Sequence, residues 1–308
     1  MLGMLVEPST GEYPTDYLLS RLRARAAAPA GTGDAAAPPD DRSGVSDRRI
    51  WGRLQAERRW LFNQLNRDLR CALAPLFVYF EISTVAQVLR FLAAGHADAA
   101  GPVLGGSLLG AELKAILRSR DSVGGVLVGL ERFFKRHGAE IKGLEKSFRE
   151  KDLGRSEELL RGGILAAGLQ RSGHKTMVSL LADLVDIRNL RVLARRLRWK
   201  TAAVPPLLAG GRLNIRLFDD QFEAADLLRM IGHWTGGAEP NPEMLQPTRL
   251  EGFLQTHLVL KTARLRRLGD PVAACIEYIF LQAALTRQQS VRFHGGSALD
   301  AAVGAGEG

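Results

Sequence analysis

The stretch Leu180–Lys200, LLADLVDIRNLRVLARRLRWK, decides the fold of this chain. Apolar residues recur in it every three or four positions, the spacing that places them on one face of an α-helix. Asp183 and Asp186 fall on the apolar side, and the arginines form a separate stripe. The stripe consists of Arg188, Arg191, Arg195 and Arg198. The segment therefore predicts a long helix with an apolar side that carries carboxylates and with one basic side.

A carboxylate on the apolar side of a helix must be paired or hydrogen-bonded, because a lone buried charge is strongly unfavourable. We expect Asp186 to organise a helix junction through nearby Asn189 or through an arginine. Acid–base catalysis is the weaker interpretation, since no histidine or second activated group accompanies the two aspartates. The arginine stripe is either a solvated face or a docking surface for an acidic partner, and the sequence leaves both interpretations open.

The same spacing of apolar residues continues over most of the chain after residue 46. Runs of alternating apolar and polar residues, which indicate strands, are few. Gly-Gly, Gly-Pro and Gly-Asp-Pro segments interrupt the pattern and mark helix ends. We therefore predict an all-α protein.

An internal repeat relates two parts of the chain at an offset of 105 residues, the separation of Glu81 and Asp186. Leu69–Leu108 aligns with His174–Leu213 without gaps. In each copy an acidic residue on an apolar helix is followed by an arginine and then by a Gly-Gly pair. The paired glycines are Gly105 and Gly210, and Gly106 and Gly211. We predict that these residues, with the two acids and Asn189, build the same helix junction in each copy.

The repeat and the composition divide the chain into six segments. Residues 1–25 contain a short helix, with Leu18 and Leu22 on one side, that we expect to pack on the C-terminal unit. Residues 26–46 are rich in Ala, Pro and Gly and predict a flexible linker. Helical repeats are predicted at 47–152, 153–246 and 247–294, and a flexible tail at 295–308. The third repeat keeps the apolar helix but lacks the acid.

The chain has 308 residues, of which 46% are hydrophobic, enough to bury a sizeable core without disulfides. No window has the roughly 18 uninterrupted apolar residues that span a bilayer, and the N-terminus does not resemble a secretory signal. We therefore expect a cytoplasmic protein that does not cross a membrane. Cys71 and Cys275 lie on apolar stretches, and we expect both to behave as buried, unpaired thiols.

The net charge of +9 predicts attraction to an acidic partner, which could be nucleic acid, anionic lipid or protein. Gly168–Thr176, GLQRSGHKT, fails as a phosphate-binding loop because His174 separates the second glycine from the lysine. The six histidines never fall at the spacing that places two ligands on one helical face. We predict no catalytic, cofactor or metal site and, because aromatic residues are sparse, no nucleic-acid partner.

Several segments of the sequence together resemble those of a known protein family. Asp186–Arg191, DIRNLR, followed by Leu207–Leu213, LLAGGRL, resembles the signature of the C-type central-stalk family of bacterial and archaeal V/A-type rotary ATPases, whose counterpart in eukaryotic V-ATPases is the d-type component. Tyr17–Arg25 resembles the opening helix of that family, Tyr79–Arg90 its first acidic helix and Pro271–Leu281 the start of its last helix. The family's last acid and Asn-Leu-Arg triplet are replaced here by Leu285 and by residues 288–290.

The resemblance implies three similar helical domains in a pseudo-threefold funnel. Proteins of this family have no enzymatic activity. Such a protein sits on the cytoplasmic face of the membrane rotor ring, receives the foot of the central stalk, and passes torque between them during ATP-coupled proton or sodium transport. Its partners would be the shaft subunits and the ring; its membrane contact would be peripheral, and it would not form a homo-oligomer. The alternatives are an independent basic helical-repeat scaffold or a nucleic-acid-binding protein and, more weakly, a helical hydrolase.

Overall fold

A computed structural model describes residues 1–8, 12–27, 46–119, 122–150, 153–200, 207–213, 222–237 and 241–304; for 46–49, 153, 244, 247, 248 and 291–304 it describes the backbone alone. The chain within these ranges is helical and has no β-strand; its only extended pairing there is an isolated antiparallel bridge between Leu5 and Leu109. The predicted all-α fold class is confirmed.

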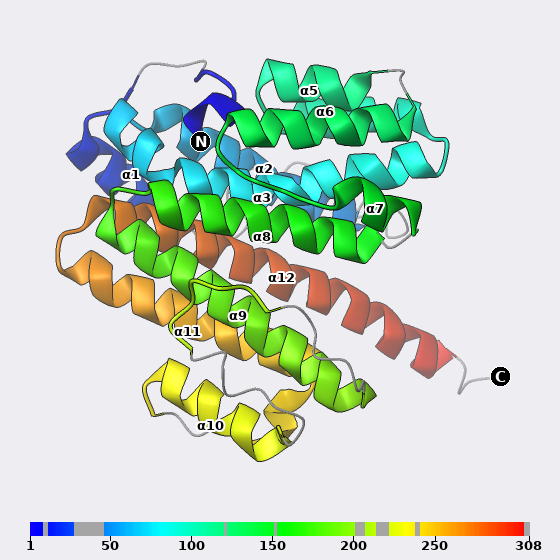
Figure 1. Ribbon diagram of the computed structural model, residues 1–308. Coiled ribbons are helices and arrows are strands. Elements are labelled where there is room, and N and C mark those ends of the chain that lie inside the picture. Colours follow the sequence, from blue (N-terminus) through cyan, green and yellow to red (C-terminus); the bar gives the residue numbers. More distant parts are fainter. Residues whose placement is uncertain are drawn as a thin grey trace. The chain divides into compact units, whose positions relative to one another are not determined.

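Twelve α-helices follow one another within the described residues (Figure 1). They are α1 (Thr15–Ala27), α2 (Ser46–Gln64), α3 (Arg67–Ala93), α4 (Ala100–Gly106), α5 (Ala111–Arg118), α6 (Val123–Arg136), α7 (Leu144–Arg149), α8 (Leu153–Arg171), α9 (Lys175–Trp199), α10 (Ala224–Thr235), α11 (Pro247–Arg267) and α12 (Pro271–Gly304). Short 3-10 helices lie at Leu2–Met4, Ala97–Ala99 and Pro242–Leu245.

One helix pair recurs three times along this order. A helix of 19 or 21 residues is followed, after a two- or three-residue break, by a helix of 25 to 34 residues. The pairs are α2–α3, α8–α9 and α11–α12. The last break shows how sequence sets such a boundary: Gly269 has a φ of +84°, and the Asp270 carboxylate accepts hydrogen bonds from the backbone N–H groups of Val272 and Ala273.

The chain separates into two compact units. Unit 1 consists of Met1–Glu7 and Arg67–Leu258, and unit 2 of Pro8–Asn66 and Val259–Gly308. The boundaries that the sequence predicts between the repeats, at residues 152 and 246, therefore both fall inside unit 1. The three-repeat division remains a prediction.

Unit 1 is built on its long helices. α3 packs along α8, and α8 packs along α9, so the three lie side by side (Figure 1). Their facing side chains include Leu73, Phe77, Leu165 and Leu181, each at most 1% exposed. Burial of such large apolar side chains is the main source of stability for helices of this kind.

The helix α3 is long and apolar enough to cross a membrane by length and composition alone. However, 67% of its most apolar window is buried inside the protein. A core helix of a globular protein has the same properties, so this helix is weak support for a membrane span.

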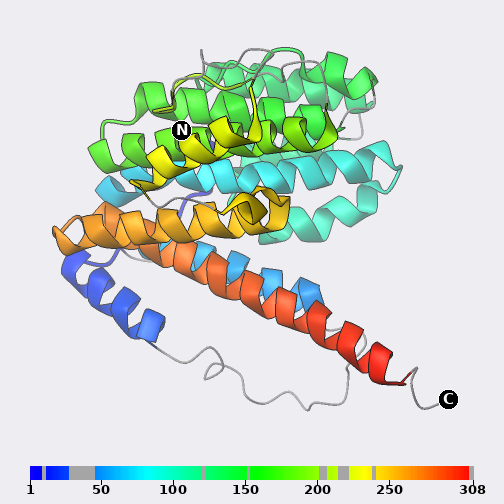
Figure 2. The same ribbon diagram turned by 90° about the horizontal axis from the view of Figure 1, so that it is seen from below.

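Unit 2 brings the first and the last α-helix of the chain together. α12 packs along α2 and also along α1 (Figure 2). Leu18 and Leu22 of α1 are buried, as their helical spacing indicates. The N-terminal helix thus lies on the last helix, the arrangement expected from the sequence.

A polar cluster joins the helices of unit 2. The Glu57 carboxylate in α2 accepts hydrogen bonds from the Arg25 guanidinium of α1, with Nη2 at 2.6 Å, and from the Tyr278 hydroxyl of α12, at 2.7 Å. Arg25 also lies over the ring of Trp60, 4.1 Å from its centroid. No sequence pattern indicated this cluster, because its members are separated by up to 253 positions along the chain.

Two predicted flexible segments differ in what the structure describes of them. The linker predicted at 26–46 falls outside the described residues over 28–45; Ala26 and Ala27 end α1, and Ser46 begins α2. In contrast, α12 continues to Gly304, so residues 295–304 of the predicted tail are helical. The alanine-rich run after Gly295-Gly296 contains no proline, and alanine has the highest helix propensity.

The two cysteines differ in exposure, which corrects the expectation that both are buried. Cys275 is buried in α12, whereas Cys71 is exposed on α3, and neither forms a disulfide. Cys71 lies in the second turn of α3, where Leu69, Arg70 and Leu73 take the buried side and leave position 71 outside.

We expect one thiol to react rapidly with Ellman's reagent in the native protein and the second only after unfolding. Exposure makes Cys71 accessible, while burial raises the pKa of Cys275 to about 12 and disfavours its thiolate. The measurement is the stoichiometry of fast labelling, with Cys71→Ser as the control that should abolish it. Two fast thiols, or none, would contradict this difference in exposure.

Candidate functional site

The Asp186 carboxylate holds the segment Leu207–Leu213 against helix α9. Its Oδ2 accepts a hydrogen bond from the backbone N–H of Arg212 at 2.9 Å, and its Oδ1 accepts one from Leu213 at 3.1 Å. The Asp186 side chain is fully buried. A buried carboxylate that accepts two backbone N–H groups fixes the position of a loop that has no helical hydrogen bonds of its own.

The Gly-Gly pair makes this approach possible. Gly210 has a φ of +100°, which L-amino acids with a side chain rarely adopt. At Gly211, an added Cβ would lie 2.0 Å from Asp186 Oδ1. The glycine at 211 is therefore required for space and the glycine at 210 for backbone conformation.

Asn189, one turn along α9, holds the start of the same segment. Its Nδ2 donates to the carbonyl of Leu208 at 2.8 Å, and its Oδ1 accepts from the Leu208 N–H at 2.9 Å. Asp186 and Asn189 therefore act in parallel on two ends of one loop. The structure brings these two residues together with the Gly-Gly pair, as the sequence grouped them, whereas we expected the aspartate to act through the asparagine or through an arginine side chain.

The electrostatics of Asp186 are those of a structural carboxyl. Burial raises its pKa above the ordinary value, and the two backbone N–H groups partly oppose that rise. The neighbouring Asp183, 1% exposed, lies 3.8 Å from Nε of Arg212. The hydrogen bonds of Asp186 go to backbone groups, so this geometry supports a helix junction rather than proton transfer.

Glu81 makes the corresponding contact in the first copy of the repeat. Its Oε1 accepts a hydrogen bond from the Leu108 N–H at 3.1 Å. Glu81 and Leu108 are the residues that align with Asp186 and Leu213, so the same bond recurs at the 105-residue offset. The glycines differ: Gly105 and Gly106 end the helix α4, and an added Cβ at Gly105 would meet nothing within 4 Å.

The arginine stripe of α9 is divided by the fold. Nε of Arg188 lies 2.5 Å from the Glu158 carboxylate, and Nη2 of Arg191 lies 3.4 Å from Glu251. Arg195 and Arg198 are exposed instead. Just beyond them, α9 ends at Trp199, whose side chain is 65% exposed, and Lys200 caps the helix. The half of the stripe toward the end of α9 is therefore the part that another molecule can reach.

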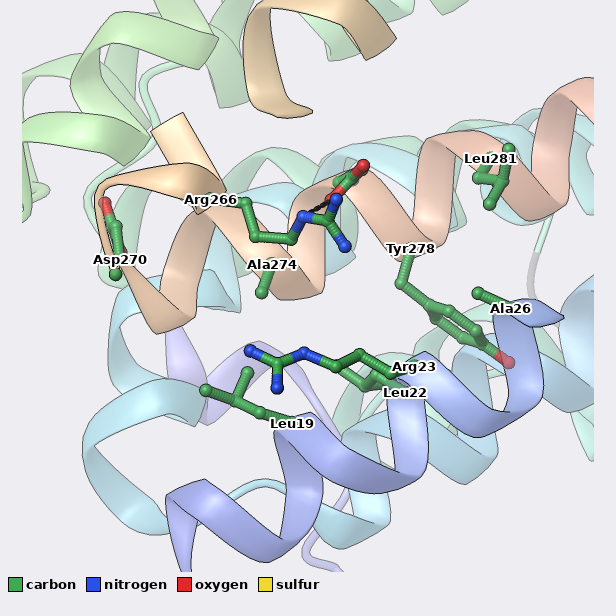
Figure 3. Close-up of a pocket in the computed structure, with 11 residues that line it drawn as sticks. Leu19, Leu22, Arg23, Ala26, Arg266, Asp270, Ala274, Tyr278 and Leu281 are labelled. Atoms are coloured by element: carbon green, nitrogen blue, oxygen red, sulfur yellow. Dashed lines mark ion pairs between the residues drawn. The ribbon is translucent and has the colours of Figure 1, made fainter. Parts of the chain in front are cut away.

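Unit 2 contains a groove of about 280 Å³ between α1 and the α11–α12 corner (Figure 3). Leu19, Leu22 and Leu281 form apolar parts of its wall, and Arg23 points into it from α1 (Figure 3). Across the groove, Arg266 pairs with Glu277 at 2.7 Å. The lining has no group with the geometry of a nucleophile beside a base.

Other candidate chemistry is equally limited in the described part of the chain. No group of three or more His, Cys, Asp or Glu side chains there could hold a metal ion. The phosphate-loop-like segment spans the end of α8, a break at residues 172–174 and the start of α9. It joins two helices, whereas a phosphate-binding loop joins a strand to a helix.

Comparison with protein-family models, curated proteins and solved structures finds no match to this chain.

Proposed function

We propose that the protein is a non-catalytic central-stalk subunit of a V/A-type rotary ATPase, which links the shaft to the membrane rotor ring. In this role three similar helical domains, built on the three helix pairs, form a pseudo-threefold socket. The protein passes torque during ATP-coupled proton or sodium transport, and the chemistry takes place in other subunits. It works at the cytoplasmic face of the membrane without spanning it.

The observation that carries this proposal is how the three helix pairs are linked. In unit 1 the long helix α3 packs on α8, the short helix of the next pair. The long helix α9 is joined to the short helix α11 by the Arg191–Glu251 ion pair. In unit 2 the long helix α12 packs on α2, the short helix of the first pair. Contacts between the long helix of one pair and the short helix of another are what repeated helix pairs need in order to pack together.

The acid junctions support the same role. Two equivalent carboxylate-to-backbone bonds, from Glu81 and from Asp186, fix loops to long helices. Buried carboxylate-to-backbone hydrogen bonds of this kind stiffen a structure, since they leave few alternative arrangements. Stiffness is the property that a torque-transmitting part needs.

We assign the docking of an acidic partner to the α9 terminal patch, defined as Arg198, Trp199 and Lys200. All three side chains are exposed, and an aromatic residue beside cations is typical of interface centres. The paired Arg188 and Arg191 are better explained as internal ties between helices.

The double variant Arg198→Glu with Trp199→Ala is expected to weaken assembly with the rotary complex about tenfold, because it removes an exposed anchor and reverses a charge. The measurement is co-purification of tagged protein at low salt, with helicity checked by circular dichroism. The matched control is Arg132→Glu with Trp51→Ala, which alters an exposed arginine and an exposed tryptophan elsewhere. Equal assembly of both variants would remove the patch from the interface.

The proposal as a whole is tested by purification from native membranes. At low ionic strength the protein should co-migrate with the other components of a rotary ATPase, and the association should weaken as salt is raised. If the protein never co-migrates with such a complex, the proposal fails. Recovery with nucleic acid, or as a free scaffold, would then favour one of the alternatives that the sequence leaves open.

A further inference from the structure

A small cavity in unit 1 is surrounded by arginines. It lies where α3, α8 and α9 meet, and its polar lining comes from Tyr79, Glu158, Arg161, Arg188, Arg191 and Arg195. Its volume of about 30 Å³ admits one or two water-sized groups. A ligand would therefore place a single compact polar group in it and keep the rest outside.

The charges around this cavity do not balance. Glu157 accepts from both Arg90 and Arg161, Glu158 pairs with Arg188, and Glu251 pairs with Arg191. The arginines of the network are Arg90, Arg161, Arg188, Arg191 and Arg195, and its carboxylates are Glu157, Glu158 and Glu251. Among the residues that the structure describes, this network therefore has five positive charges against three negative charges, a surplus of two. The exposed Arg195 contributes to that surplus at the edge of the cavity.

The surplus indicates what kind of anion fits. A carboxylate side chain brings one negative charge, whereas a phosphoryl group brings about 1.5 to 2 at neutral pH. Arginine also binds phosphoryl oxygens through its planar fork of N–H groups. Burial raises the pKa of Tyr79, so its hydroxyl stays protonated at neutral pH and can donate to an anion.

We propose that the arginine cavity, lined by Tyr79, Arg161, Arg188, Arg191 and Arg195, binds the phosphoryl group of free phosphate or of a phosphate monoester. The site is distinct from the α9 terminal patch and does not depend on membership in a rotary ATPase. A protein that never joins such a complex would still bind phosphate here.

The test is titration of the full chain with inorganic phosphate at constant ionic strength, with binding measured by calorimetry. The wild-type protein should bind saturably, and Arg195→Gln should bind about tenfold more weakly, because it removes one charged donor while the Arg188–Glu158 and Arg191–Glu251 pairs stay intact. The matched control, Arg132→Gln, removes an exposed arginine of α6 and should bind like the wild type. Circular dichroism checks that each variant is folded.

Vesicles that contain a phosphatidylinositol monophosphate form a second arm. Arg195-dependent binding to free phosphate assigns the site to a soluble ligand, and Arg195-dependent binding to vesicles alone assigns it to a lipid headgroup. The proposal is overturned if neither probe binds, or if the wild type, Arg195→Gln and Arg132→Gln bind both probes equally. The last outcome would mean general attraction of anions to a basic protein.

Discussion

Asp186→Ala is expected to lower the free energy of unfolding by about 3 kcal/mol, among the largest effects of any single substitution in this chain. The change removes the acceptor for the backbone N–H groups of Arg212 and Leu213 and leaves a void beside α9. Leu213 is 8% exposed, so water replaces the lost bond only in part. The measurement is urea unfolding followed by circular dichroism, in which the midpoint should fall by about 1 M or more.

Two further variants control this result. Glu81→Ala removes the bond from the backbone N–H of the buried Leu108 in the first copy. Asp186→Ala removes two such backbone bonds, so the expected cost of Glu81→Ala is smaller, about 1 kcal/mol. Asp186→Asn keeps one acceptor oxygen and should fall between wild type and Asp186→Ala. If Asp186→Ala costs no more than Glu81→Ala, the aspartate does not hold the loop.

Gly211→Ala is the second large effect, with an expected cost of about 3 kcal/mol. The new Cβ would stand 2.0 Å from Asp186 Oδ1, and a short aspartate side chain cannot move aside without losing its backbone partners. Either the carboxylate or the loop must shift. Thermal and urea unfolding of the purified variant measure the loss.

Gly105→Ala is the matched control, because it changes a glycine of the aligned Gly-Gly pair. Gly105 lies in α4 with open space where the Cβ would be, so alanine should leave stability unchanged or raise it by up to about 1 kcal/mol. The Asp186→Ala background gives a second check: there the cost of Gly211→Ala should shrink, since the clash is relieved. Full additivity of the two changes would contradict a direct contact.

The sequence predicted the parts of the site that lie within one helix or one repeat. The spacing of apolar residues located the helices, and the alignment at an offset of 105 residues grouped Asp186, Asn189 and the Gly-Gly loop without any knowledge of contacts. These inferences succeed because helical periodicity and a repeated motif are local or self-similar signals. They also placed Glu81 at a helix junction of the first copy, and the structure shows its bond to the Leu108 N–H.

Contacts between distant helices gave no such signal. Nothing in the spacing of Arg188 or Arg191 indicates that Glu158 and Glu251 neutralise them. In the sequence the four arginines of the stripe look alike. The ion pairs with α8 and α11 distinguish the paired arginines from the exposed ones. The exposure of Cys71 has the same origin, since its face of α3 is defined by which neighbours pack there. The identical Gly-Gly pairs likewise differ in backbone conformation and in their neighbours: Gly105 lies in a helix with open space beside it, whereas Gly211 lies against Asp186.

The sequence by itself determined an all-helical chain, its repeated acid-and-glycine motif and its excess of positive charge. Only the tertiary structure decided which arginines remain available, which glycine is indispensable, and that a surplus of positive charge gathers around one cavity of unit 1. The physical reason is that charge compensation and steric clearance depend on distances between segments far apart in the chain, whereas helix formation depends on residues three and four positions apart.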